Sequence, residues 1–126
     1  MWRVKTGSKY GSRKVVVEGI EFDSKKEANR YRELRVLYAA GRISDLQLQV
    51  PFELIPAQRE PDTYGVRGGL RRGKLLEHSV VYYADFVYID EHGNKIVEDA
   101  KGVKTDVYRI KKKLMLYVHG IKIKEV

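Results

Sequence analysis

LLEHSVVYYADFVYIDEHGNKIVEDAK, residues 75–101, predicts a β-hairpin at the centre of the fold. Residues 75–90 are dense in β-branched and aromatic side chains, which favour a long strand. Residues 91–94 supply a turn, and residues 95–101 return as the partner strand. Both strands are apolar on both faces, which is typical of strands that lie between two layers of helices in an α/β domain.

The segments around this hairpin complete a single domain over residues 1–126. Each has the periodicity or the turn residues of a regular element: a hairpin at 15–22, a helix at 24–41, a strand at 46–54, a helix at 105–120 and a strand at 121–126. After the first hairpin the order is therefore helix, three strands, helix and strand. We expect a mixed sheet that is flanked by helices.

Both helices have recognisable ends. Ser24, with Glu27 three residues later, has the spacing of a capping box, and Thr105 is the expected N-cap of the second helix. The second helix is followed by Gly120, a usual stop signal. Its apolar stripe is expected to face the core and consists of Val107, Ile110, Leu114, Tyr117 and Val118.

The composition limits the functional classes. The chain has no cysteine, which excludes disulfides and thiolate-bound zinc, and it has no apolar run of membrane-spanning length. A cytoplasmic protein without a membrane partner is the expectation. The formal net charge is +8, and both ends are basic around a slightly acidic middle.

Such a charge distribution suits a protein that binds a polyanion. A basic tail at 1–14, a flexible basic loop at 56–74 and the second helix region are the expected contacts with nucleic acid. The alternative is a basic surface without that role. The candidate residues are Lys5, Lys9, Arg13, Lys14, Arg67, Arg71, Arg72, Lys74, Lys104 and Lys113.

Asp85 is the one charged residue in the run VVYYADFVY, where an isolated carboxylate is costly unless it is paired or binds metal. Hairpin pairing places it beside Asp99, with Lys101 on the same face of the next strand and Glu98 on the other face. Two converging carboxylates favour Mg²⁺ or Mn²⁺. A structural ion pair at Asp85, or a strand end running into solvent, remains the alternative. A bulge would bring Glu98 to the metal instead.

This arrangement resembles the PD-(D/E)XK nuclease superfamily. Asp85 matches the acid of its second core strand, and Asp99-Ala100-Lys101 matches its (D/E)-x-K on the third. Ala84 stands where the motif has proline. The stretches GIEFDSKKEANRY, LQVPFEL, YYADFVY and VEDAKG also look like those of small phage and prophage nuclease-like proteins.

The resemblance implies a restriction-endonuclease-like core and a Mg²⁺-dependent endonuclease. Its substrate would be branched, nicked or single-stranded DNA in phage replication or recombination, as for Holliday-junction resolvases, which are dimers. Asp85, Asp99 and the Ala100 carbonyl would hold the metal, and Lys101 would act on the attacking water. A homodimer and a non-catalytic nucleic-acid-binding protein of the same fold stay open.

Three further residues are candidates for supporting roles. Glu27 lies on the inward stripe of the first helix, where the resemblance implies an acid near the metal; its alternative is the capping box. Lys111, or in its place Lys113, on the second helix matches a supporting basic position that the resemblance implies; the alternative is a solvated helix face. Gln49, on the strand at 46–54, is a candidate for contact with the site or the nucleic acid; its alternative is the solvated face of an edge strand.

Overall fold

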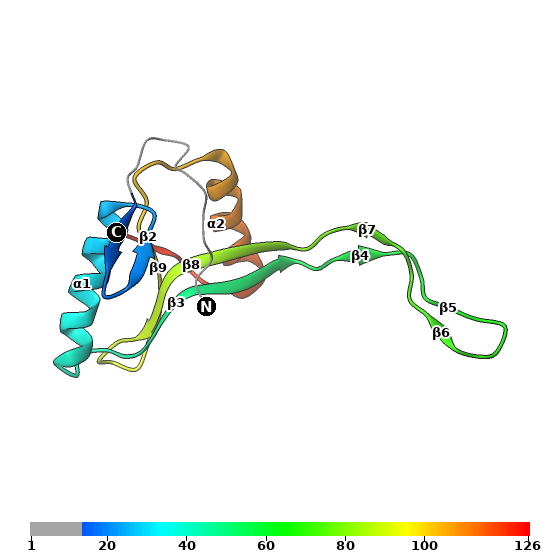
Figure 1. Ribbon diagram of the computed structural model, residues 1–126, viewed down its shortest axis with the longest axis horizontal. Helices are drawn as coiled ribbons and strands as arrows, with labels where there is room; N and C mark the ends of the chain where they lie inside the picture. Colours follow the sequence, from blue (N-terminus) through cyan, green and yellow to red (C-terminus); the bar gives the residue numbers. More distant parts are fainter. Residues whose placement is uncertain (1–13) are drawn as a thin grey trace.

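The strand-forming residues of the central stretch lie in the middle of a four-stranded mixed sheet (Figure 1). In the computed structural model, which describes residues 14–126, the strand order is β10-β9-β8-β3. β8 (Val80–Ile89) pairs antiparallel with β9 (Lys95–Asp99) and with β3 (Ser44–Ile55). β10 (Lys124–Glu125) runs parallel to β9, so the predicted mixed sheet is confirmed.

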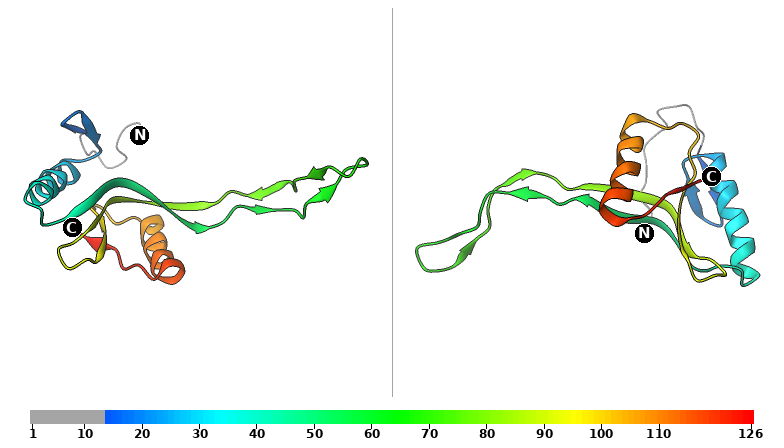
Figure 2. Two further views of the ribbon diagram at one scale, coloured as in Figure 1. Left: turned by 90° about the horizontal axis from the view of Figure 1, so that it is seen from below. Right: turned by 180° about the vertical axis from the view of Figure 1, so that it is seen from behind.

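Two helices cover the opposite faces of this sheet, α1 (Lys25–Ala39) and α2 (Asp106–His119) (Figure 2). The expected caps are present: the side chains of Ser24 and Thr105 each accept a backbone N–H from the first turn at 3.1 Å. Gly120 ends α2 in the left-handed region, with φ of 66°. The helix ends were predictable because side chains close in sequence make these bonds.

The N-terminal hairpin is also confirmed. β1 (Val15–Val17) pairs antiparallel with β2 (Ile20–Phe22) and lies beside α1. Its two turn residues, Glu18 and Gly19, both have positive φ, 51° and 79°, as a tight two-residue hairpin turn requires.

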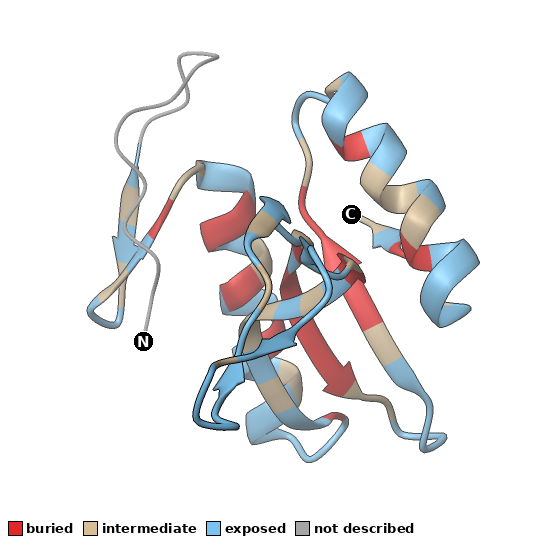
Figure 3. Cartoon of the chain, turned by 90° about the vertical axis from the view of Figure 1, so that its right-hand side faces the viewer, coloured by how far each residue is buried: buried red, intermediate tan, exposed pale blue. Residues whose placement is uncertain are grey.

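β8 contributes to two separate cores, one under each helix (Figure 3). The core under α1 contains Phe22, Ala28, Tyr31, Leu34, Ile43, Phe86 and Tyr88. The core under α2 contains Leu54, Tyr82, Ala84, Val87, Val97, Tyr108, Met115 and Ile123. The central strand is therefore apolar on both faces because each face packs against its own helix.

The expected buried stripe of α2 is wrong. Val107, Ile110, Tyr117 and Val118 are exposed, with Tyr117 88% exposed, and Leu114 is only partly buried. The helix instead turns Tyr108 and Met115, two turns apart, to the sheet. Because α2 carries apolar residues on more than one side, helical spacing alone does not show which side docks.

The segment 56–74, expected to be a flexible basic loop, contains regular paired strands. This segment extends the β3–β8 hairpin into a long two-stranded arm that leaves the sheet (Figure 1). β4 (Gln58–Arg59) pairs with β7 (Leu75–Glu77), and β5 (Thr63–Tyr64) pairs with β6 (Leu70–Arg71). These strands are held by backbone hydrogen bonds and do not need alternating apolar side chains. The composition of the segment, rich in glycine, proline and arginine, therefore gave no sign of them.

In residues 14–126 neither helix is long and apolar enough to cross a membrane.

Candidate active site

Asp85 stands on β8 with its carboxylate bonded by two N–H groups. Its Oδ2 accepts the backbone N–H of Ala100 at 2.9 Å, and its Oδ1 accepts the side-chain amide of Gln49 at 3.0 Å. Asp85 is only 7% exposed. These hydrogen bonds offset the free-energy cost of holding a carboxylate among apolar neighbours.

Asp99 lies beside Asp85. The β8–β9 register pairs Phe86 with Glu98, and one further step in the same register sets Asp85 opposite Asp99. Asp99 is 1% exposed; its Oδ1 accepts the Tyr82 hydroxyl at 2.7 Å, and its Oδ2 is 3.6 Å from the Lys101 ammonium. The structure thus brings together the two acids and the lysine that the sequence singled out.

Glu98 faces the other layer, and its suggested role as a metal ligand is not supported by its surroundings. Its two carboxylate oxygens accept Nε and Nη2 of Arg30, on α1, at 2.8 and 2.7 Å. The Tyr88 hydroxyl donates a further hydrogen bond to it. This bonding to Glu98 raises the pKa of the Arg30 guanidinium, and burial raises the pKa of Tyr88. No bulge re-aims β9, so Glu98 is a structural residue under α1.

Gln49 has a backbone conformation that is rare for its residue type. Its φ is 51° in the middle of β3, in the left-handed region that costs a non-glycine residue about 1 kcal/mol or more. Its amide nitrogen lies 3.0 Å from Asp85 Oδ1 and 3.4 Å from Glu27 Oε1. The unusual conformation thus places one amide between two carboxylates.

The apolar side chains of β3 change from one face of the sheet to the other near Gln49. The apolar residues of β3 occupy every second position from 46 to 52. Leu46 and Leu48 nevertheless pack with the core under α1, while Val50 and Phe52 pack with the core under α2. A regular strand would keep them on one face. Gln49 lies between these two pairs, at the point where the apolar side of β3 changes from the α1 core to the α2 core.

Glu27 lies in the first turn of α1, with its backbone at the cap and its side chain turned towards Gln49. Its backbone N–H caps α1 through Ser24, while its side chain, 6% exposed, reaches the Gln49 amide. The Gln49 amide links Glu27 to Asp85, because its nitrogen lies close to one carboxylate oxygen of each residue.

We expect Gln49→Gly and Gln49→Ala to separate the amide from the backbone conformation. Both remove the amide, so both should lower any activity of the site by about 10–100-fold, as loss of a group that orients a ligand does. Glycine alone adopts positive φ freely, so Gln49→Gly should unfold with a free energy about 1 kcal/mol higher than Gln49→Ala. Urea unfolding measures the difference, and equal stabilities would contradict the assigned backbone strain.

Two lysines lie near the acids. Lys101 places its ammonium 4.9 Å from the centre of the Tyr108 ring, and its carbonyl accepts Lys26 at 2.8 Å. Lys111, from α2, donates to the carbonyl of Val81 at 2.9 Å. Both line the same cavity as Asp85.

Residues 7–124 match the model of a family described as "Protein of unknown function (DUF1064)". The chain belongs to the DUF1064 family. No curated protein and no solved structure matches the chain. The match thus covers nearly the whole chain.

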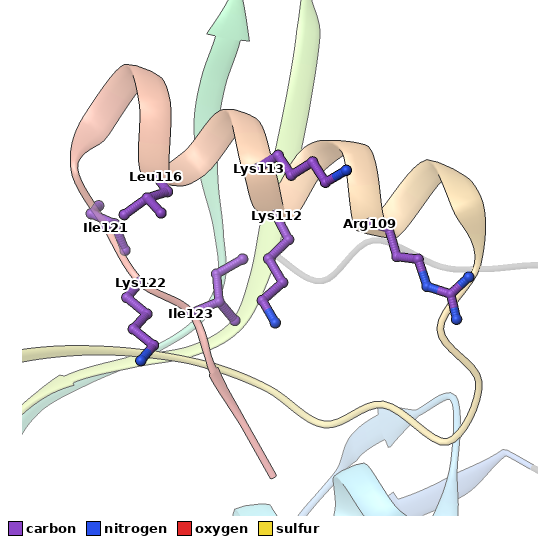
Figure 4. Close-up of a pocket in the computed structure, with 7 residues that line it drawn as sticks. All are labelled: Arg109, Lys112, Lys113, Leu116, Ile121, Lys122 and Ile123. Atoms are coloured by element: carbon purple, nitrogen blue, oxygen red, sulfur yellow. The ribbon is translucent and has the colours of Figure 1, made fainter.

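The cavity at the site encloses about 170 Å³ between β3, β8 and the start of α2. Its lining is mainly polar and consists of Gln49, Tyr82, Tyr83, Asp85, Lys101, Thr105, Val107, Tyr108 and Lys111. Asp99 is buried behind it, held by Tyr82. A larger cavity, about 300 Å³, lies under the far side of α2 and is lined by four cations and three aliphatic side chains without a carboxylate (Figure 4). Of these two cavities, only the smaller one has a carboxylate in its lining, that of Asp85.

Two tyrosines of this cavity, Tyr82 and Tyr108, were not among the candidate residues. Burial and the charge of Asp99 raise the pKa of Tyr82 far above its ordinary value, so its hydroxyl stays a donor to Asp99. Burial also raises the pKa of Tyr108, whose hydroxyl donates to Glu125 at 2.9 Å. Their hydroxyls could not be assigned from sequence because their partners lie 17 residues away.

Glu125 anchors Tyr108 and gives a prediction on pH. Lys112, bonded at 2.9 Å, lowers the pKa of Glu125 from 4.5 to about 2. A depressed carboxylate pKa stabilises the folded state above about pH 4.5, and this stabilisation is lost as the pH falls towards 2. We expect Glu125→Gln to flatten the acid limb of a Tm-versus-pH curve between these values. An unchanged acid limb would contradict the assignment.

The donor groups fit a hard divalent cation. Mg²⁺ is usually held by one or two carboxylates together with waters and substrate phosphate, and Asp85 with Asp99 offers such a pair. In residues 14–126 no three His, Cys, Asp or Glu side chains form a ready metal-binding group.

The expected nucleic-acid contacts fall in three places. Lys5, Lys9 and Arg13 lie outside the described residues. Arg67, Arg71, Arg72 and Lys74 lie on the arm and are exposed. The others are Lys14, which is paired with Glu21 at 3.1 Å, Lys104, which is 3.4 Å from Glu125, and Lys113, which lines the larger cavity.

Proposed function

We propose that this protein is a Mg²⁺-dependent nuclease with a restriction-endonuclease-like core, which hydrolyses phosphodiester bonds in DNA. The observation that carries the proposal is the meeting of Asp85 and Asp99 on neighbouring strands, with Lys101 3.6 Å from Asp99. Buried acids that converge with a lysine at a polar cavity are characteristic of functional sites. The motif resemblance supports the same chemistry.

Each residue has a role that follows from its contacts. Asp85 and Asp99 would hold the cation, with the Ala100 carbonyl as a further oxygen ligand. Bound Mg²⁺ or Mn²⁺ supplies a positive charge for the scissile phosphate and lowers the pKa of a coordinated water. Lys101 orients or deprotonates the attacking water, or offsets the negative charge that develops on the phosphate.

The surrounding residues position these groups. Tyr82 holds one Asp99 oxygen by a 2.7 Å hydrogen bond, and the Tyr108 ring lies 4.9 Å from the Lys101 ammonium. Gln49 fixes Asp85 and connects it to Glu27. Catalysis of this kind depends on charged groups that are held in place before the substrate arrives.

A cleavage assay tests the proposal. Branched, nicked, duplex and single-stranded DNA are incubated with the full chain in Mg²⁺ or Mn²⁺, next to Asp85→Ala and Lys101→Ala. We expect the wild type to cut at least one structured substrate and both variants to lose cleavage. Cleavage that survives both substitutions would remove the site assignment.

The second candidate is a nucleic-acid-binding protein that keeps the fold without catalysis. The observation in its favour is the basic, exposed arm, which does not depend on the acids. Salt-sensitive DNA binding without cleavage of any of these substrates would favour this function. The register that sets Asp85 opposite Asp99, with Lys101 3.6 Å from Asp99, argues for the nuclease.

A further inference from the structure

The arm, residues 56–79, is the one long extension of the described chain beyond its sheet (Figures 1 and 2). Within 56–79 no residue is buried. An isolated two-stranded ribbon is marginally stable in water, since it has no core. A partner that covers the arm would supply the missing contacts.

The charge of the distal part of the arm, residues 63–74, indicates a polyanion as this partner. Residues 63–74 carry four cations and no acid: Arg67, Arg71, Arg72 and Lys74. All four are exposed. Arginine binds phosphate with a planar pair of donors, so three arginines at the end of a ribbon suit a nucleic-acid backbone.

The tip of the arm adds apolar groups to these cations. Gly68 donates its N–H to the carbonyl of Gly65 at 2.9 Å and has φ of 80°, which places Val66 at the turn. The Val66 side chain is fully exposed, and Tyr64 and Leu70 beside it are 76% and 64% exposed. Apolar side chains between cations suit the edges of bases, such as the thymine methyl group in the major groove.

Close packing at Gly73 fixes the direction of the arm beyond this residue. A Cβ built on Gly73 would lie 1.6 Å from the carbonyl oxygen of Glu60, so no other residue fits there without moving the backbone. The joint is closed by hydrogen bonds from Gly73 N–H to Asp62 at 2.7 Å and from Glu60 N–H to the Lys74 carbonyl at 2.8 Å. The distal arm is thus held in a defined direction.

We propose that the arm inserts as a β-ribbon into the major groove of duplex DNA next to the cleavage site. Two paired strands are about 4.8 Å apart and carry side chains on both sides, which fits a groove about 12 Å wide and not a minor groove about 6 Å wide. The deep, narrow major groove of A-form RNA excludes such a ribbon. The proposal rests on the proposed function in taking DNA as substrate, and it adds that a duplex segment must flank the cut.

Binding of a DNA duplex, measured by fluorescence anisotropy over a range of salt concentrations, tests the charges. The variant carries Arg67→Gln, Arg71→Gln and Arg72→Gln. Loss of three phosphate contacts should reduce the slope of log K against log[salt] by about 3 and weaken binding at least about tenfold. The matched control replaces three exposed arginines of the body, Arg32, Arg35 and Arg42, by glutamine and should leave the slope unchanged.

Gly73→Ala tests the geometry of the arm without changing its charge. We expect weaker duplex binding and loss of protection of guanine N7, the major-groove atom, from dimethyl sulfate. Single-strand binding should be unchanged. Protection of adenine N3 alone, or triple-glutamine and Gly73→Ala variants that bind duplex like the wild type, would overturn the proposal. So would a fall in molecular mass of either variant with unchanged DNA binding, which would assign the arm to a second copy.

These readouts do not depend on cleavage. Arm-dependent protection of N7 by a protein that cuts no substrate would leave the arm proposal standing and remove the proposed function. Arm variants that bind duplex DNA with wild-type affinity and still cut it would support the proposed function and contradict the arm proposal.

Discussion

Asp85→Asn is expected to slow DNA cleavage by at least about a thousandfold at saturating Mg²⁺ and DNA. Metal-assisted charge stabilisation supplies several kcal/mol at the transition state, and each 1.36 kcal/mol is a factor of about ten in rate. Asparagine keeps the size of the side chain and an oxygen for the Ala100 N–H, which is 2.9 Å from Asp85. The free energy of unfolding should therefore change by only about 1 kcal/mol.

Single-turnover cleavage and urea unfolding of the same preparation measure these two quantities. Glu91→Gln is the control, because it removes an exposed carboxylate from the turn of the same hairpin. It should leave the cleavage rate within about twofold of wild type. A loss of rate in Asp85→Asn that is matched by general unfolding would count against a direct role for this carboxylate.

Arg30→Met is expected to lower the free energy of unfolding by about 3–5 kcal/mol. Glu98 is fully buried, and Arg30 binds both of its oxygens, at 2.8 and 2.7 Å. Removal of the guanidinium leaves a buried negative charge whose other contacts are the Tyr88 hydroxyl and Lys124, 3.9 Å away. Chemical denaturation at neutral pH measures the loss.

The double variant Arg30→Met with Glu98→Leu separates the charge from the packing. Replacement of a buried pair by apolar residues is often neutral, so the double variant should recover most of the lost stability. Its cleavage rate should be close to that of the wild type, because Glu98 faces α1 and not the cavity. A folded Glu98→Leu variant that loses cleavage would contradict the assignment of the metal to Asp99.

The elements that the sequence predicted well are those fixed by neighbours in the chain. Ser24, Thr105 and Gly120 end their helices through bonds within a turn, and the hairpin turn sets the β8–β9 register. That register alone carries Asp85 to Asp99. The placement of Asp85 opposite Asp99, at the centre of the candidate site, could therefore be predicted from the sequence.

The features that were missed depend on contacts between distant segments. Arg30 and Glu98 are 68 residues apart, and the phase change at Gln49 arises because β3 crosses from one core to the other. The buried face of α2 was wrong because an exposed apolar stripe, including Tyr117, competes with Tyr108 and Met115 in any periodicity argument. Local spacing cannot rank two apolar faces of one helix.

The most direct test of the central claim is the rate of cleavage of a labelled branched DNA as a function of Mg²⁺ concentration, for wild type and Asp99→Asn. We predict a wild-type rate that rises with Mg²⁺, saturates and is abolished by a chelator, and no measurable rate above background for Asp99→Asn. Cleavage that persists in the chelator, or an Asp99→Asn rate equal to that of the wild type, would contradict the account.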